Sequence, residues 1–254
     1  MNFQVSSVVD KLRRGVAKTI QAASENEAYD SLPECEDLLL ADKFTVKVYE
    51  LTDEISPSPS DFKPVHFEVC AKGVSGGKFF DGELVAGQGI LLKTARGKVA
   101  MDIRLPDNSR SYMGKILHPA GATLYKVSQY YFQIEFNRKL GAGNEWHIVR
   151  NGQPVLNFVS TPMKEIFGVL RSLVRLFICM NGEYSLDFYK MNCDSIAFVR
   201  PSIFSKKQSI ELEFKEGSTT REERAAILGS SILFLIVNIY PEYGEMLERS
   251  LPHL

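Results

Sequence analysis

Hydrophobic and polar residues alternate in short runs through most of this chain. Between residues 36 and 215, eleven runs either alternate with a period of two or are rich in β-branched and aromatic residues. These runs are 43–51, 65–71, 89–95, 97–105, 122–128, 130–136, 146–150, 154–160, 184–190, 195–200 and 209–214. Glycine-containing turns separate several of them, at Ala95-Arg96-Gly97, Asn151-Gly152 and Asn181-Gly182. Because no helices alternate with these strands, the pattern predicts an antiparallel sandwich or barrel.

The passage "EERAAILGSSILFLIVNIYPEY" (222–243) is the most apolar part of the chain. Its apolar run, 225–240, is shorter than the roughly 20 residues that a membrane-spanning helix needs. Small and polar residues interrupt this run, namely Gly229, Ser230, Ser231 and Asn238. Thr219 or Thr220 is a candidate N-cap, and Pro241 ends the helix. A helix that is apolar on nearly every side must be enclosed by protein or lie in lipid. We expect an enclosed core helix, and a membrane-inserting segment is the alternative.

Residues 5–23 have the periodicity of an amphipathic helix. Valine, leucine and isoleucine side chains form one face, and four basic residues lie largely on the other: Lys11, Arg13, Arg14 and Lys18. Since Asp10 is the one acidic residue in 1–24, this stretch has a local net charge of +3. The helix is therefore expected either to lie on a membrane surface, where the four basic residues would contact it, or to pack on the barrel.

The following stretch, 25–37, is acidic and is typical of a linker. We therefore divide the chain into an N-terminal helix and linker, 1–35, and a barrel domain, 36–254. Within the barrel domain, one stretch does not read as β: residues 163–182 have apolar positions at helical spacing and predict a short amphipathic helix.

Composition and net charge do not indicate a particular function. The 254 residues are 44% hydrophobic and 24% charged, which is ordinary for a globular protein. The formal net charge of -1 gives no global attraction to nucleic acid or to an anionic membrane, so such binding would need a local patch. The four cysteines form no C-x-x-C pair, which argues against a zinc site or a small disulfide framework. No early apolar run resembles a signal peptide, and we expect a cytoplasmic protein that is peripheral to membranes if it binds them.

Two features of the sequence are candidates for catalysis or metal binding. The letters "GVSGG" (73–77) match a nucleophile elbow with Ser75 as nucleophile, but that motif needs a helix after it, and the glycine-rich sequence after Gly77 predicts a loop. The histidines, His66, His118, His147 and His253, are scattered without the spacing of a metal site. We expect no catalytic residue, no metal and no cofactor.

One predicted hairpin is rich in cations. Lys93, Arg96, Lys98 and Arg104 all fall within the hairpin formed by the two predicted strands and the turn at 95–97. Such a group could contact the phosphorylated headgroup of a lipid. The alternative is ordinary solvation of charged side chains at a hairpin tip.

Three blocks of sequence resemble the tubby-like superfamily, which includes tubby proteins, plant LURP-related proteins and phospholipid scramblases. They are "GILLKTARGKVAMDIRLP" (89–106), "MGKILHP" (113–119), and "YSLDFYKMNCDSIAFVRP" (184–201) followed by "SIELEF" and "ERAAILGSSILFLIVNIYPE" (223–242). The likeness is greatest to the scramblases, and it implies a closed barrel of about 12 antiparallel strands around a central hydrophobic C-terminal helix. The cysteine-rich segment and the acidic calcium-binding stretch of scramblases have no counterpart in this sequence.

The resemblance and the basic stretches lead to one functional expectation. We expect a non-enzymatic, tubby-like protein of the scramblase type that binds acidic phospholipid, including phosphoinositides, or a membrane-associated protein. The alternative is a structural or protein-interaction subunit of a larger assembly without lipid binding. An enzyme of unrecognised type would depend on Ser75. No specific binding of nucleic acid is indicated.

Overall fold

The computed structural model describes residues 31–49, 65–72, 77–85, 89–105, 112–129, 144–162, 184–201 and 209–239. Several sequence predictions fall outside these residues, among them the amphipathic helices over 5–23 and 163–182, the strand over 130–136, the turn at Asn181-Gly182, Ser75 and the helix end at Pro241.

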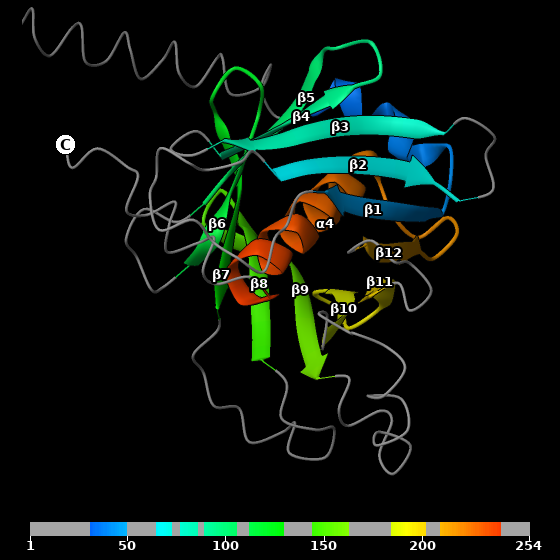
Figure 1. Ribbon diagram of the computed structural model, residues 1–254. Helices are drawn as coiled ribbons and strands as arrows, with labels where there is room; N and C mark the ends of the chain where they lie inside the picture. Colours follow the sequence, from blue (N-terminus) through cyan, green and yellow to red (C-terminus); the bar gives the residue numbers. More distant parts are fainter. Residues whose placement is uncertain are drawn as a thin grey trace, which may run out of the picture. The chain divides into compact units, whose positions relative to one another are not determined.

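The described strands form a closed antiparallel barrel of twelve strands (Figure 1). In chain order they are β1 (Lys43–Tyr49), β2 (Val65–Ala71), β3 (Lys78–Val85), β4 (Gly89–Thr94), β5 (Val99–Arg104), β6 (Tyr112–Leu117), β7 (Thr123–Gln129), β8 (Asn144–Arg150), β9 (Gln153–Pro162), β10 (Tyr184–Lys190), β11 (Ser195–Pro201) and β12 (Ser209–Phe214). Each strand pairs with its neighbours in sequence, and β1 pairs with β12, with Thr45 opposite Glu211, to close the barrel. The predicted mostly-β fold with a closed antiparallel barrel is confirmed.

Strand alternation puts one side of each strand into the core. In β2, for example, Val65, Phe67, Val69 and Ala71 are buried, whereas the residues between them are partly exposed. This is the period of two on which the sequence prediction depended.

Strand β3 was expected to be a loop, and that interpretation was wrong. Its glycines led to it, but Gly82 lies on the buried row between Phe80 and Leu84. A Cβ atom added at Gly82 would lie 2.5 Å from Leu92 Cδ2 of the neighbouring strand. The glycine therefore allows β3 and β4 to pack closely, and it does not break the strand.

One α-helix, α4 (Arg221–Phe234), follows β12 and continues into a π-helical turn, η5 (Leu235–Ile239). Thr220 is its N-cap: its hydroxyl accepts a hydrogen bond from the Glu223 amide at 3.2 Å, and the Glu223 carboxylate accepts one from the Thr220 amide at 2.8 Å. This capping box confirms the predicted start of the helix. No helix in the described ranges is long and apolar enough to cross a membrane.

Every residue of α4 and η5 from Arg224 to Ile236 is buried. The hydroxyl groups of Ser230 and Ser231 donate back to the carbonyl oxygens one turn earlier, each at 2.7 Å, so they do not remain unpaired in the apolar core. Burial on all faces requires protein on all faces.

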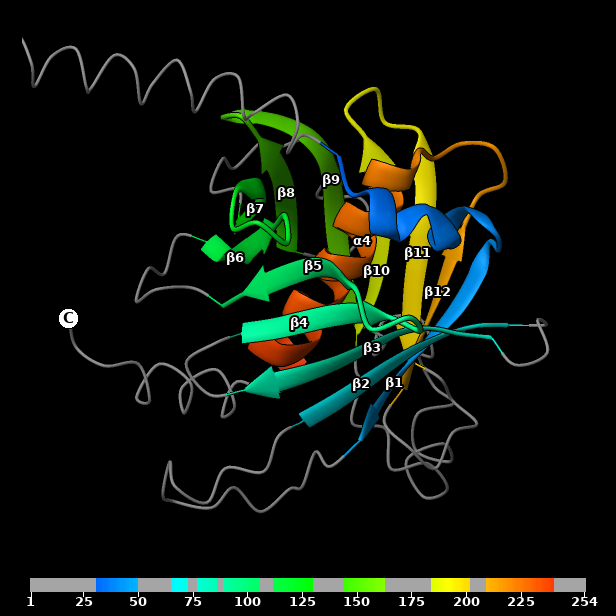
Figure 2. The same ribbon diagram turned by 90° about the horizontal axis from the view of Figure 1, so that it is seen from above.

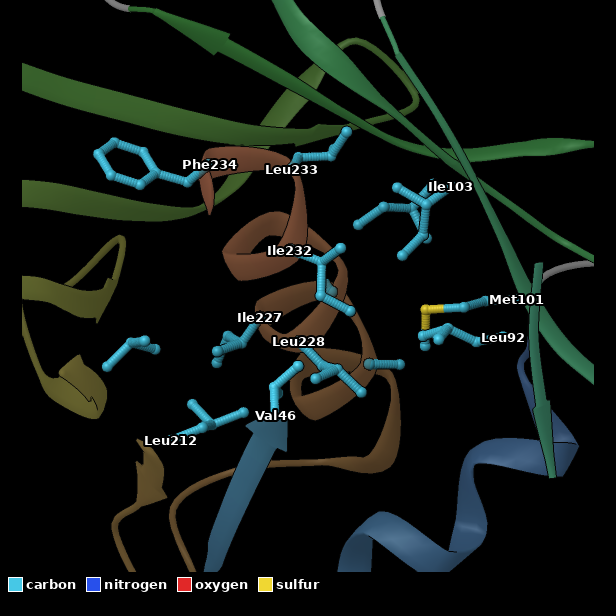
Figure 3. Packing of buried hydrophobic residues seen from close by; sticks show 14 of the residues in the cluster. Val46, Leu92, Met101, Ile103, Leu212, Ile227, Leu228, Ile232, Leu233 and Phe234 are labelled. Atoms are coloured by element: carbon cyan, nitrogen blue, oxygen red, sulfur yellow. The ribbon is translucent and has the colours of Figure 1, made fainter. Parts of the chain in front are cut away.

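Side chains of several strands contact α4 (Figure 3). A Cβ added at Gly229 would lie 2.6 Å from Ile116 Cδ1 of β6, and one added at Gly114 of the same strand would lie 2.6 Å from Leu233 Cδ2. The Phe234 ring meets the edge of Phe158 of β9 at a centroid distance of 6.2 Å. The close approach of α4 to β6 thus depends on one glycine in each element.

A short 3₁₀-helix, η1 (Pro33–Leu39), lies beside the first turns of α4 (Figure 2). Leu32, Cys35 and Leu38 are fully buried, and the Cys35 thiol donates to the Ala100 carbonyl oxygen of β5 at 3.8 Å. Residues 33–37, which were interpreted as the end of a linker, are therefore part of the hydrophobic core. The spacing of the buried side chains by three residues matches the 3₁₀ repeat.

Arg224 joins α4 to η1 and to the residues between η1 and β1. Its guanidinium donates to four oxygen atoms: Leu38 O at 2.7 Å, Ala41 O at 2.6 Å, Asp42 Oδ1 at 2.6 Å and Thr219 Oγ1 at 2.8 Å. Its Cζ atom also lies 4.6 Å from the centroid of the Phe214 ring. A buried charge is tolerated only when it is paired and hydrogen-bonded, and Arg224 meets both conditions.

The alternating strand directions place the β4–β5, β6–β7, β8–β9 and β10–β11 turns at the barrel end where β12 leads into α4. At the β8–β9 turn, Asn151 and Gly152 have φ values of 50° and 78°. Positive φ at both positions is the signature of the type I′ hairpin that the sequence predicted.

Candidate functional site

The four cations predicted as a headgroup site do not lie together. Lys93 is opposite Val99, next to the β4–β5 turn, and Arg96 and Lys98 lie in that turn. Arg104 is at the other end of β5, six residues beyond Lys98, which corresponds to roughly 20 Å along a strand. The hairpin therefore separates Arg104 from the other three residues.

The cations near the turn differ in their contacts. Lys98 Nζ lies 2.9 Å from Glu34 Oε1 of η1, so this lysine links the hairpin to η1. Lys93 and Arg96 are exposed, and neither forms an ion pair with another described residue. The hairpin tip thus presents two exposed cations, and its third cation is paired with η1.

A second set of cations crosses three adjacent strands. In the barrel register, Arg104 of β5 is opposite Lys115 of β6, and Lys115 is opposite Lys126 of β7. Opposite residues on antiparallel strands point to the same face. Their neighbours Ile103, Ile116 and Val127 are fully buried, so the three cations lie on the outer face. We call Arg104, Lys115 and Lys126 the basic row.

Like charges directly opposite each other destabilise a sheet. At the two ends of the basic row, the neighbouring residues are Gly89 of β4 and Val149 of β8, which carry no charge. On the outer face of β12, β1 and β2, Lys43 and Glu213 are 3.0 Å apart and Lys72 and Glu211 are 3.2 Å apart. The basic row therefore brings three basic residues together on adjacent strands of a chain that is close to neutral overall.

Asp102 orients the arginine of the basic row. Its Oδ2 atom accepts from Arg104 Nε at 2.8 Å and lies 2.7 Å from Arg104 Nη2. The Asp102 side chain is 8% exposed and the Arg104 side chain 44%. A guanidinium has five N–H donors, so three remain for other acceptors. Gly89 has no side chain, and the Arg104 chain lies close beside it: a Cβ there would be 3.0 Å from Arg104 Cδ.

Lys115 is held by a strand that packs directly on α4. The residues on either side of it, Gly114 and Ile116, face Leu233 and Gly229 of the helix. The backbone position of Lys115 is therefore fixed by this packing, and binding sites are most precise when their residues lie on rigid elements.

We find no match for this chain in comparisons with protein-family models, with curated proteins or with solved structures.

The motifs considered for catalysis and metal binding do not form a site in the described parts of the chain. Ser75 lies outside the described residues, and the element after "GVSGG" is strand β3, where a nucleophile elbow needs a helix. No group of three or more His, Cys, Asp or Glu side chains within the described ranges could hold a metal ion.

Near His66, the polar groups are engaged with one another. Glu68 Oε2 accepts from the Tyr49 hydroxyl at 2.6 Å, and its Oε1 lies 3.3 Å from Lys78 Nζ. The hydrogen bond to Glu68 raises the pKa of Tyr49 to about 12, and the same bond lowers the pKa of Glu68. This arrangement is a surface hydrogen-bond network between β1, β2 and β3.

A further polar group lies on the outer face of β8, β9 and β10. Asn157 Nδ2 donates to Glu145 Oε1 at 3.2 Å, and His147 Nε2 lies 3.4 Å from the same oxygen. Burial raises the pKa of Asp187, and burial together with the Asp187 charge raises the pKa of Tyr189. These groups bond to one another, whereas the basic row brings three basic residues together on adjacent strands, so we take the basic row as the strongest candidate site.

Sequence reasoning missed two of its three members. Lys115 and Lys126 are ordinary isolated lysines in the sequence, and β6 was not among the eleven predicted strands. The resemblance block "MGKILHP" did mark β6 as a strand, but only the register brings its lysine between Arg104 and Lys126.

Proposed function

We propose that this chain is a non-enzymatic, tubby-like barrel of the scramblase type that binds the anionic surface of membranes. The observation that carries the proposal is the basic row on β5, β6 and β7. The twelve-stranded closed barrel and the capped helix after the last strand agree with what the resemblance implies for the fold.

In this proposal α4 is the central helix of the barrel and remains there when the protein binds a membrane. Its complete burial from Arg224 to Ile236 and its contacts with β6 and β9 support this role. Withdrawing the helix would expose a large apolar surface and break the four hydrogen bonds of Arg224. Membrane attachment is therefore electrostatic and uses the outer face of the barrel.

Each lysine or arginine near an anionic bilayer contributes about 1 kcal/mol. The three cations of the basic row then contribute about 3 kcal/mol, which corresponds to roughly a hundredfold increase in membrane partitioning. The attraction is screened within about 8 Å at physiological salt, so it decreases at higher ionic strength.

Co-sedimentation with phosphatidylserine vesicles at low salt tests the proposal. We expect the full chain to sediment with these vesicles, to be released by high salt, and to stay in solution with neutral vesicles. The double variant Lys115→Gln/Lys126→Gln should bind roughly thirtyfold more weakly. Its matched control, Lys43→Gln/Lys72→Gln, removes the same charge from a different part of the barrel's outer face, and it should bind nearly as well as the unaltered chain. Absence of binding at low salt would refute the proposal.

A second candidate function is docking to another protein without lipid binding. It is favoured by three large apolar side chains exposed near the α4 end of the barrel: Leu39 at 47%, Leu40 at 68% and Met191 at 47%. Consecutive exposed leucines are typical of contact surfaces between proteins. A stable stoichiometric complex that is lost in a Leu39→Ser/Leu40→Ser variant, together with no vesicle binding, would favour this function over the first.

A further inference from the structure

We propose that the α4 end of the barrel binds a basic amphipathic segment of a partner protein through Leu39, Leu40 and Met191. We call these three residues the apolar end patch. The inference rests on the second candidate function and deepens it, because it names the chemistry of the partner. It concerns the end of the barrel, whereas membrane binding is proposed for the outer face of β5, β6 and β7.

Exposed large apolar side chains gather at one end of the described structure. Within the described ranges they are the members of the apolar end patch, with exposed fractions of 47% for Leu39, 68% for Leu40 and 47% for Met191. Leu39 is the last residue of η1, Leu40 follows it, and Met191 lies in the turn between β10 and β11. None of the large apolar side chains on the described strands is exposed to this degree.

Both segments that form the patch are held against the first turn of α4. Arg224 donates hydrogen bonds to the carbonyl oxygens that flank the two leucines in the chain, at 2.7 and 2.6 Å. Lys190, which directly precedes Met191, has its Nζ atom 3.3 Å from Glu223 Oε1. The backbone that carries the patch is therefore fixed to the helix, and rigid elements make the most precise binding surfaces.

The packing of η1 does not account for the two exposed leucines. The 3₁₀ repeat buries Leu32, Cys35 and Leu38 in the core, and Leu39 and Leu40 come after the last of these. A polar side chain at either position would leave those core contacts unchanged. A single exposed leucine needs no explanation, but exposed apolar side chains that gather in one place are typical of a contact surface.

The chain around the two leucines is acidic. Residues 33–42 contain four acidic residues and no lysine or arginine. Glu34 and Asp42 are paired with cations at 2.9 and 2.6 Å. Glu36 and Asp37 form no ion pair with another described residue. The leucines therefore lie beside two carboxylates whose negative charge is not compensated within the described structure.

The cations at this end of the barrel do not neutralise these two carboxylates. Lys190 and Arg221 are paired with glutamates of α4, at 3.3 and 2.6 Å. Lys215 is followed by Glu216, and both are exposed, so together they add no net charge. The β4–β5 turn contacts the first turn of η1, whereas the leucines lie at its last turn and after it.

Charge distinguishes between three possible occupants of the patch. Glu36 and Asp37 would repel an anionic membrane. A second copy of the chain, docked through the same patch, would bring the same acidic segments together, because a twofold interface pairs one surface with itself. A partner segment that has apolar side chains on one face, with lysine or arginine beside them, matches both the leucines and the carboxylates.

Two model peptides test the inference by fluorescence anisotropy with the full chain. Both peptides have leucine at helical spacing, and their remaining positions are lysine in one and glutamate in the other. We expect the leucine–lysine peptide to bind about tenfold more tightly than the leucine–glutamate peptide. The variant Leu39→Ser/Leu40→Ser should bind the leucine–lysine peptide about thirtyfold more weakly, because the peptide then covers little apolar surface.

A second variant tests the acidic part of the surface. Glu36→Gln/Asp37→Asn should bind the leucine–lysine peptide about fivefold more weakly and with less dependence on salt. Its matched control, Glu211→Gln/Glu213→Gln, removes the same charge from the outer face of β12 and should bind as the unaltered chain does. Circular dichroism checks that each variant is folded.

Equal affinity for the two peptides, or affinity that Leu39→Ser/Leu40→Ser leaves unchanged, overturns the inference. A dimer in sedimentation velocity that this variant abolishes, without peptide binding, also overturns it, since a second copy then occupies the patch. Phosphatidylserine vesicle binding that the variant abolishes overturns it in favour of a membrane. A stoichiometric protein complex that needs the leucines but not the carboxylates overturns the inference and leaves the second candidate function intact. Failure of vesicle binding with the peptide preference intact refutes membrane binding alone and supports the inference.

Discussion

Replacing Gly229 by alanine tests how closely α4 packs against β6. An alanine Cβ at this position would lie 2.6 Å from Ile116 Cδ1 and 2.9 Å from Ile116 Cγ1. Both distances are shorter than van der Waals contact. Ile116 is fully buried, so its side chain cannot turn into solvent to make room.

Two effects of opposite sign determine the size of the change. Glycine to alanine in a helix interior stabilises by about 1 kcal/mol. Forcing an additional methyl group into a packed core costs about 1–3 kcal/mol. We expect the second effect to exceed the first, with a net decrease in the free energy of unfolding of about 1 kcal/mol and at most about 2 kcal/mol.

Urea unfolding measures this free energy. The chain has one tryptophan, and Trp146 is buried and stacked on Phe158 at a centroid distance of 6.3 Å, so its fluorescence reports on the barrel core. Far-ultraviolet circular dichroism provides the second probe that a two-state analysis requires.

The variant Ile116→Val separates the clash from other effects, because it removes the Cδ1 atom that lies nearest to the added methyl group. In the Ile116→Val background, Gly229→Ala should be less destabilising, with a coupling energy of about 1 kcal/mol between the two sites. If Gly229→Ala stabilises the protein by about 1 kcal/mol in both backgrounds, helix propensity alone is acting. That result would refute the close packing of α4 against β6.

Three further predictions concern the α4 end of the barrel. Arg224→Lys should lower the free energy of unfolding by about 1–3 kcal/mol, because lysine has too few donors for the carbonyl oxygens of Leu38 and Ala41 and for Asp42 together; a loss well under about 1 kcal/mol in urea unfolding would contradict this. Thr220→Ala should cost about 1 kcal/mol in the same assay, whereas Thr220→Ser should cost little, since serine also caps. Burial raises the pKa of the Cys35 thiol from 9.0 to about 12, so the unfolded chain releases this proton first as the pH rises. The stability that the buried, protonated thiol provides is therefore complete below pH 9 and is lost between pH 9 and 12. Cys35→Ala should flatten the plot of the free energy of unfolding against pH over that range. In the native protein at pH 8, a maleimide should label exposed Cys193 and leave buried Cys35 unmodified, which peptide mapping can check.

Most of the barrel could be predicted because its strands carry local signals. The alternation in β2 and the Asn151-Gly152 turn depend only on neighbouring residues, and both are as expected. Strand β3 was missed because Gly82 is explained by its close packing against Leu92 of β4, and a local sequence pattern cannot show such a contact. The linker interpretation of 33–37 failed for a related reason: acidic residues dominate that stretch, yet Cys35 within it and Leu38 directly after it are buried.

The candidate site was predictable only in small part. Charge density along the chain selected the β4–β5 hairpin, because Lys93, Arg96, Lys98 and Arg104 are close in sequence. The hairpin nevertheless places Arg104 at its base and the other three cations near its tip, and Lys98 is paired with Glu34 of η1. Lys115 and Lys126 were not noticed, since each is isolated in its own strand.

The sequence by itself indicated that this chain forms many antiparallel strands and one capped helix that is apolar on nearly every side and therefore needs to be enclosed. Those properties follow from local periodicity and from the chemistry of caps and turns. Tertiary structure alone decided which outward side chains become neighbours. Strand register joins residues that are more than ten positions apart in the chain, and a shift of one position would move each of them to the opposite face of the sheet. Arg104, Lys115 and Lys126 are adjacent for that reason.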